Sequence, residues 1–90
     1  MKKHKSFLIK GKVQGVGYRF SCLEKAHKNK ILGFVTNRED GSVYVEAEGL
    51  EKDLANFKEW LLKGPAWARV KEVEEESGLM KHFESFEIMR

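Results

Sequence analysis

Two periods of apolar and polar residues run along this chain and predict a mixture of strands and helices. A period of two is typical of half-buried strands, and a period near 3.6 is typical of amphipathic helices. Glycine, proline and Asp-Gly pairs separate the periodic stretches and predict the turns. In chain order we expect strand 6–13, helix 18–29, strand 31–37, strand 42–48, helix 50–63, strand 69–76 and a short last strand at 86–88.

The first helix and the fourth strand each carry a local prediction. The helical period places four residues on the buried side of the first helix, Phe20, Leu23, Ala26 and His27. Asn29 tolerates the left-handed conformation that commonly ends a helix, so we expect the helix to end there. In the fourth strand Val70 and Val73 are three residues apart instead of two, which predicts a bulge or irregular pairing.

The order β-α-β-β-α-β, followed by a short extra strand, is the split βαβ or ferredoxin-like pattern. It predicts an α+β fold of two layers, with two helices on one face of a mainly antiparallel sheet. Because crossover connections are right-handed, the first and second strands run in the same direction with the third strand between them. A chain of 90 residues has room for one core, so we expect a single domain over residues 1–90.

The junction between the first strand and the first helix, KVQGVGYRF at residues 12–20, has the composition of an anion site. Gly15 and Gly17 adopt positive φ freely and can turn successive backbone N–H groups toward one point. The helix start adds unpaired N–H groups, and Arg19 adds a planar fork of donors that suits phosphate or carboxylate. Asn37 ends the second strand at the same edge, about 10 Å away across one strand. Both side chains can therefore reach a tetrahedral anion placed between them, and phosphate fits best.

The residues alone leave a plainer interpretation open, in which the two glycines only form the turn between strand and helix. Two known phosphate motifs do not match this loop. The P-loop requires Gly-Lys-Ser or Gly-Lys-Thr, which is absent after the loop, and the dinucleotide fingerprint requires a third glycine where this chain has Phe20. At the level of local chemistry, the choice between a phosphate loop and a plain turn stays open.

Composition and charge argue against several other functions. The chain has 17 basic and 14 acidic residues, and its net charge of +3 is too small for a nucleic-acid-binding stripe. No apolar run approaches the roughly 20 residues of a membrane span, so we expect no membrane partner. The single cysteine, Cys22, cannot form an internal disulfide, which favours a reducing, cytoplasmic setting. The histidines show no ligand spacing, so we expect no metal site.

The glycine loop also carries a resemblance to a known family. GKVQGVGYRF at residues 11–20 is similar to the signature of the acylphosphatase family, which is close to G-x-V-Q-G-V-x-[FY]-R. GFVTNREDGSV at 33–43 resembles the strand–turn–strand of that family with its asparagine. EGLEKDLANFKEWLLKGPAWARV at 48–70 and the closing FEIMR also resemble the family, so the resemblance covers nearly the whole chain in order.

The resemblance implies an enzyme that hydrolyses the carboxyl–phosphate bond of small acyl phosphates, giving a carboxylate and inorganic phosphate, without a metal or another cofactor. At the positions that match the family motif, the resemblance implies that Arg19 binds the phosphoryl group and that Asn37 orients the attacking water. The amides that hold the phosphoryl oxygens are those of Gly15, Val16, Gly17, Tyr18 and Arg19. The partners are then the acyl phosphate substrate and inorganic phosphate, which is both product and competitive ligand, and we expect a monomer.

The sequence departs from the family pattern at two places. Asn29-Lys30 stands where the family usually has Leu-Gly after the first helix, which affects a helix cap rather than the site. Thr36 precedes Asn37 where the family often has arginine. This second departure bears on substrate preference and leaves both catalytic positions intact.

A ferredoxin-like RNA-binding or interaction module without catalysis is the main alternative, because RNA-recognition domains share this order of elements. Such a domain stacks bases on aromatic residues of its first and third strands. Here the third strand offers Tyr44 beside Glu46 and Glu48, whose carboxylates repel phosphates. The presence of Arg19 and Asn37 argues against a catalytically idle member of the family. The sequence therefore favours the enzyme.

Overall fold

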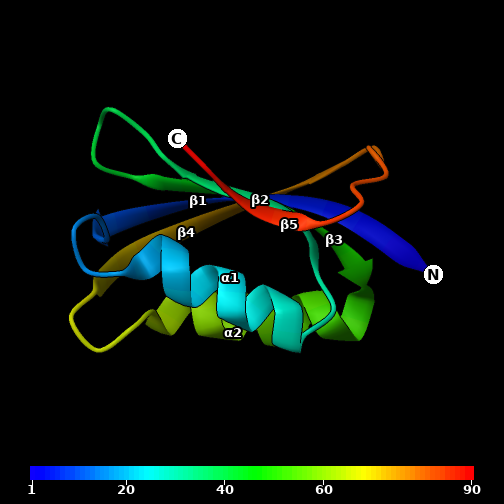
Figure 1. The fold of residues 1–90 in the computed structure, drawn as a ribbon, viewed down its shortest axis with the longest axis horizontal. Coiled ribbons are helices and arrows are strands. Elements are labelled where there is room, and N and C mark those ends of the chain that lie inside the picture. The colour runs from blue at the N-terminus through cyan, green and yellow to red at the C-terminus, as the bar shows by residue number, and fades with distance from the viewer.

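The computed structural model describes all 90 residues and contains the expected elements in the expected order. The elements are β1 (Lys2–Lys12), α1 (Tyr18–Lys28), β2 (Leu32–Asn37), β3 (Val43–Leu50), α2 (Glu51–Lys63), β4 (Arg69–Gly78) and β5 (Phe86–Met89). The strands form one five-stranded sheet, and both helices lie on the same face of it (Figure 1). This is the predicted ferredoxin-like α+β sandwich, and neither helix is long and apolar enough to cross a membrane.

The strand order β4-β1-β3-β2-β5 brings three strand ends to one edge of the sheet. β3 pairs antiparallel with both β1 and β2, so β1 and β2 run in the same direction, as predicted. β5 pairs parallel with β2, with Val35 opposite Ile88 and Thr36 opposite Met89. The carboxyl ends of β1, β2 and β5 therefore meet at one edge, next to the start of α1.

The core lies between the two helices and the face of the sheet that they cover. It consists of 15 buried apolar residues. α2 contributes Leu54, Phe57 and Leu61, which confirms the helical period predicted for this segment. The ring of Phe57 meets that of Phe7 from β1 edge to face, with the centroids 6.5 Å apart. Full burial of a side chain of this size stabilises the fold by about 1.5–3 kcal/mol.

The first helix buries only part of the face predicted for it. α1 buries Tyr18, Cys22 and Ala26, whereas Phe20 is 62% exposed. The hydroxyl of Tyr18 donates a buried hydrogen bond to the carbonyl of Leu61 at 2.6 Å, which fixes the rotation of the helix. The residues four and eight positions after Tyr18 follow it into the core. The prediction is correct for Ala26 and for the half-buried Leu23, which packs against the core. It is wrong for Phe20 and His27, which are exposed, because it began the apolar period at Phe20 instead of Tyr18.

The irregular pairing predicted for the fourth strand is confirmed. β1 pairs antiparallel with β4, and Lys10 lies opposite Glu72 whereas Gly11 lies opposite Val70. One residue of β4, Lys71, is therefore extra at this point. An extra residue on one strand of a pair is a β-bulge, which bends the strand locally.

The end of the first helix differs in detail from the prediction. α1 ends at Lys28, and Asn29 keeps a negative φ of −97°. The left-handed conformation falls on Lys30, with φ 59°. The Asn29 side chain donates from Nδ2 to the carbonyl of Lys25 at 2.9 Å. Asparagine thus closes the helix through its amide group rather than through its backbone conformation.

Candidate active site

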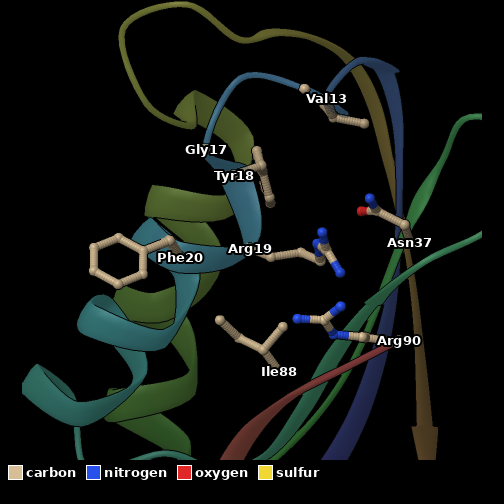
Figure 2. A pocket seen from close by; sticks show the side chains of 9 residues that line it. Val13, Gly17, Tyr18, Arg19, Phe20, Asn37, Ile88 and Arg90 are labelled. Carbon is tan, nitrogen blue, oxygen red and sulfur yellow. The ribbon is translucent and has the colours of Figure 1, made fainter.

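A cavity of about 310 Å³ opens at the edge where the carboxyl ends of the strands meet the start of α1 (Figure 2). Its volume suits a small molecule. The residues that line it are Val13, Gly15, Gly17, Tyr18, Arg19, Phe20, Asn37, Ile88 and Arg90. No acidic side chain is among them, so the cavity favours an anion.

The glycine loop between β1 and α1 leaves its backbone donors free for such an anion. Gly15 and Gly17 have φ of 74° and 80°, in the left-handed region where glycine is unstrained. Gly17 is the N-cap of α1, and no side chain caps the helix or places a negative charge in its first turn. The first-turn N–H groups and the positive end of the helix dipole therefore remain available to a ligand.

Gln14 ties this loop to the turn that follows β2. Its Nε2 donates to the carbonyls of Arg38 and Ser42, at 2.7 and 2.8 Å. The same turn directly follows Asn37, so these two bonds hold the loop and the end of β2 at a constant separation. Sequence reasoning gave Gln14 no role, because nothing in the local pattern shows which carbonyls a loop amide will reach.

Tyr18 anchors the first turn of α1 from beneath. Its buried hydroxyl is bonded to α2, and its ring lies 5.2 Å from that of Trp60, centroid to centroid. Burial raises the pKa of the Tyr18 phenol well above its ordinary value. The hydroxyl therefore stays protonated and serves as a structural donor, which positions the next residue, Arg19.

The two predicted catalytic side chains face the same cavity from different elements. Arg19 comes from the first turn of α1 and Asn37 is the last residue of β2, and their side chains point toward each other (Figure 2). Arg19 forms no ion pair in the protein. Asn37 Oδ1 is buried and has no hydrogen-bond partner in the protein. Because buried polar atoms are normally paired, this oxygen is an available acceptor for a ligand or a water.

Not all of the residues whose backbone amides were predicted to hold the phosphoryl group line the cavity. Gly15, Gly17, Tyr18 and Arg19 line the cavity, whereas Val16 does not. The Val16 side chain packs against the hydrophobic core. A role for its backbone N–H stays a prediction.

Four lining residues were not predicted as part of the site. Val13 and Phe20 flank the predicted glycine loop, whereas Ile88 and Arg90 come from the end of the chain. The latter two reach the cavity because β5 pairs parallel with β2, a pairing that the order of elements does not specify. The alternation of Phe86, Ile88 and Arg90 was the available signal, since it places all three on one face of a strand.

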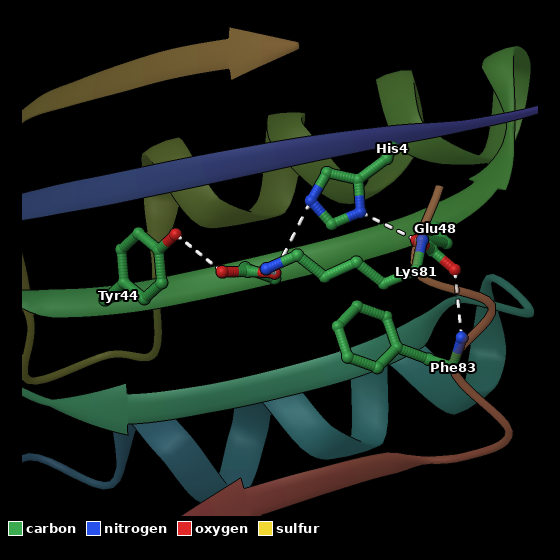
Figure 3. Close-up of polar contacts among 6 residues, drawn as sticks. His4, Tyr44, Glu48, Lys81 and Phe83 are labelled. Atoms are coloured by element: carbon green, nitrogen blue, oxygen red, sulfur yellow. Dashed lines mark hydrogen bonds and ion pairs between the residues drawn. The ribbon is translucent and has the colours of Figure 1, made fainter. Parts of the chain in front are cut away.

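A buried carboxylate holds the segment that leads into β5 (Figure 3). Glu48 is 1% exposed and accepts hydrogen bonds from the backbone N–H groups of Lys81 and Phe83, at 2.6 and 3.0 Å. His4 Nδ1 lies 2.7 Å from the same carboxylate. Burial opposes ionisation, but these bonds outweigh it and lower the pKa of Glu48 below its ordinary value. Glu48 lies on the face of the sheet opposite the helices, where residues 79–85 cover it.

Known proteins share this fold and much of this sequence. The model of the family described as Acylphosphatase matches residues 5–88. An acylphosphatase of Actinobacillus pleuropneumoniae serotype 5b (strain L20) is 44% identical over 89 residues, 98% of this chain and 99% of that protein. One from Bacillus licheniformis is 40% identical over 82 residues, 90% of this chain and 91% of that protein. The crystal structure of acylphosphatase from Bacillus subtilis matches with a TM-score of 0.95 at 32% identity, over 100% of both chains. The chain therefore belongs to the acylphosphatase family, as its glycine loop indicated.

Proposed function

We propose that this cavity hydrolyses acyl phosphates, with Arg19 binding the phosphoryl group and Asn37 positioning the attacking water. A member of the acylphosphatase family is a hydrolase, and its substrate is a small acyl phosphate. One observation supports these roles: Arg19, Asn37 and the glycine loop all line the same cavity, which has no acidic side chain.

The reaction requires positioning and charge stabilisation more than acid–base chemistry. The carboxylate is a good leaving group and needs little help from an acid. The phosphoryl oxygens accept hydrogen bonds from the loop amides and from the Arg19 guanidinium, which stabilise the charge of the transition state. Asn37 Oδ1 accepts a hydrogen bond from the water and holds it in line with the phosphorus–carboxylate bond.

The proton of the water has no acceptor among the side chains of the cavity. Arginine stays protonated, an asparagine amide does not titrate, and burial keeps Tyr18 protonated. We propose that the water oxygen bonds to phosphorus while the bond from phosphorus to the acyl oxygen breaks. A phosphoryl oxygen takes the proton of the water, so one acyl phosphate and one water give one carboxylate and one dihydrogen phosphate.

The RNA-binding or interaction alternative has less support. The third strand of such a module would have to offer an open aromatic face. Here the Tyr44 hydroxyl donates to Glu46 at 2.8 Å, and Glu46 itself is 7% exposed. Carboxylates on this face repel the phosphates of a nucleic acid, and residues 79–85 lie over part of it.

We also propose that residues 1–90 act as one domain, as a monomer, and in the cytoplasm. One cluster of buried apolar residues joins both helices to the sheet, which supports one domain. The chain is compact, with a radius of gyration of 11.7 Å, which fits a monomer. Cys22 is buried and free, which fits a reducing compartment.

We expect the purified protein to release phosphate from acetyl phosphate at the same rate with and without excess EDTA. The proposed site supplies its charge stabilisation through amides and a guanidinium, and no three His, Cys, Asp or Glu side chains gather to hold a metal ion. A phosphate-release assay with and without the chelator measures this. Activity that disappears in EDTA and returns with a divalent cation would contradict the proposed chemistry.

Inorganic phosphate should inhibit competitively, because the loop and Arg19 bind the phosphoryl end of substrate and product alike. The apparent KM for acetyl phosphate should rise linearly with phosphate concentration while kcat stays constant. Initial rates at several phosphate concentrations test this pattern. If phosphate lowers kcat and leaves the apparent KM unchanged, the two ligands do not share the cavity.

A further inference from the structure

Arg90 brings a second guanidinium into the cavity that Arg19 lines. In the parallel pairing of β5 with β2, Met89 lies opposite Thr36. The next residues of the two strands, Arg90 and Asn37, therefore lie side by side, on strands about 4.8 Å apart. The close-up shows the guanidinium of Arg90 pointing toward that of Arg19 (Figure 2).

The charge of this pair is not balanced by the protein. Neither Arg19 nor Arg90 forms an ion pair, and no acidic side chain lines the cavity. Two like charges that face one cavity repel each other, and an anion bound between them removes that repulsion. The phosphoryl group of an acyl phosphate and inorganic phosphate both carry up to two negative charges above pH 6, which matches two guanidinium groups.

We propose that Arg90 is a second phosphoryl-binding residue, which acts together with Arg19 on the same anion. This inference rests on the proposed function of the cavity and adds a ligand from the last strand, outside the glycine-loop motif. Arg90 lies at the end of β5, beside the strand end that carries Asn37. It contacts the phosphoryl oxygens in the substrate, the transition state and the product, and therefore contributes to binding more than to the chemical step.

Replacing Arg90 by glutamine tests this assignment against a matched control. The control is Arg69→Gln, which removes the same charge at the start of β4, near the same edge of the sheet but outside the cavity. Titration calorimetry with inorganic phosphate gives the dissociation constant, and steady-state kinetics with acetyl phosphate gives KM and kcat. The thermal midpoint reports whether each variant is folded.

In Arg90→Gln we expect the Kd for phosphate and the KM for acetyl phosphate to rise together by about tenfold, the usual effect of one lost charge-assisted bond. The kcat should stay within about threefold, and Arg69→Gln should change all three quantities by less than about twofold. Arg90→Lys, which keeps the charge and loses the fork, should lie between the parent and Arg90→Gln.

Two outcomes would overturn the assignment. Arg90→Gln could bind phosphate as tightly as the parent, or Arg69→Gln could weaken it equally, which would make the effect one of overall charge. If the proposed function itself is wrong, the result differs from both of these outcomes, because the parent protein would then leave acetyl phosphate intact. Phosphate binding that is weakened only in Arg90→Gln would support the Arg90 assignment even then.

Discussion

Replacing Arg19 by lysine should lower kcat/KM for acetyl phosphate by about 10³-fold or more. Lysine keeps the positive charge but loses the planar fork that donates two hydrogen bonds to one anion. The guanidinium faces oxygens whose charge must be stabilised in the transition state, and comparable arginines in other phosphoryl transfers contribute about 10³–10⁵ in rate. Steady-state kinetics of the purified variant measures the loss.

The fold should tolerate this substitution, because Arg19 forms no ion pair in the protein. The thermal midpoint should therefore remain close to that of the parent. Arg69→Lys makes the same chemical change at the start of β4, outside the cavity, and should keep the parental kcat/KM. If Arg19→Lys also keeps nearly normal kcat/KM, the phosphoryl group binds somewhere else.

The edge of the sheet that carries this site could be predicted because it depends on features that are local in sequence. Gly15, Gly17 and Arg19 form one continuous motif, and the order of elements fixes the directions of β1 and β2. Asn37 then has to lie at the same edge as the loop. The cavity that contains all four residues confirms this part of the prediction.

The remainder of the site depends on contacts between distant segments, which local patterns do not encode. Arg90 reaches the cavity only because β5 pairs with β2 rather than with β4, the outer strand on the other side of the sheet. Glu48 looks like a solvated residue in sequence but is buried, because residues 79–85 cross over it and donate two backbone N–H groups. The burial of Tyr18 was missed for a similar reason, since its hydrogen bond to Leu61 joins two helices.

Replacing Asn37 by alanine should lower kcat by about 10²–10³-fold and leave KM within a few-fold. Asn37 is proposed to hold the water and not the substrate, so truncation leaves the glycine loop and Arg19 in place. Loss of one positioned polar group at such a site costs about this much in rate. An interaction needed only to reach the transition state changes kcat rather than ground-state binding. The affinity for inorganic phosphate should therefore also be nearly unchanged.

The thermal stability of Asn37→Ala distinguishes a role of Asn37 in positioning water from a purely structural role. Asn37 Oδ1 has no hydrogen-bond partner in the protein, so alanine removes a buried unpaired oxygen and should not lower the thermal midpoint. Asn29→Ala is the matched control, because it removes the bond to the Lys25 carbonyl far from the cavity. That variant should lose some stability and keep its kcat. If Asn37→Ala behaves like the control, with a lower midpoint and normal kcat, then Asn37 only shapes the turn after β2, and another group positions the water.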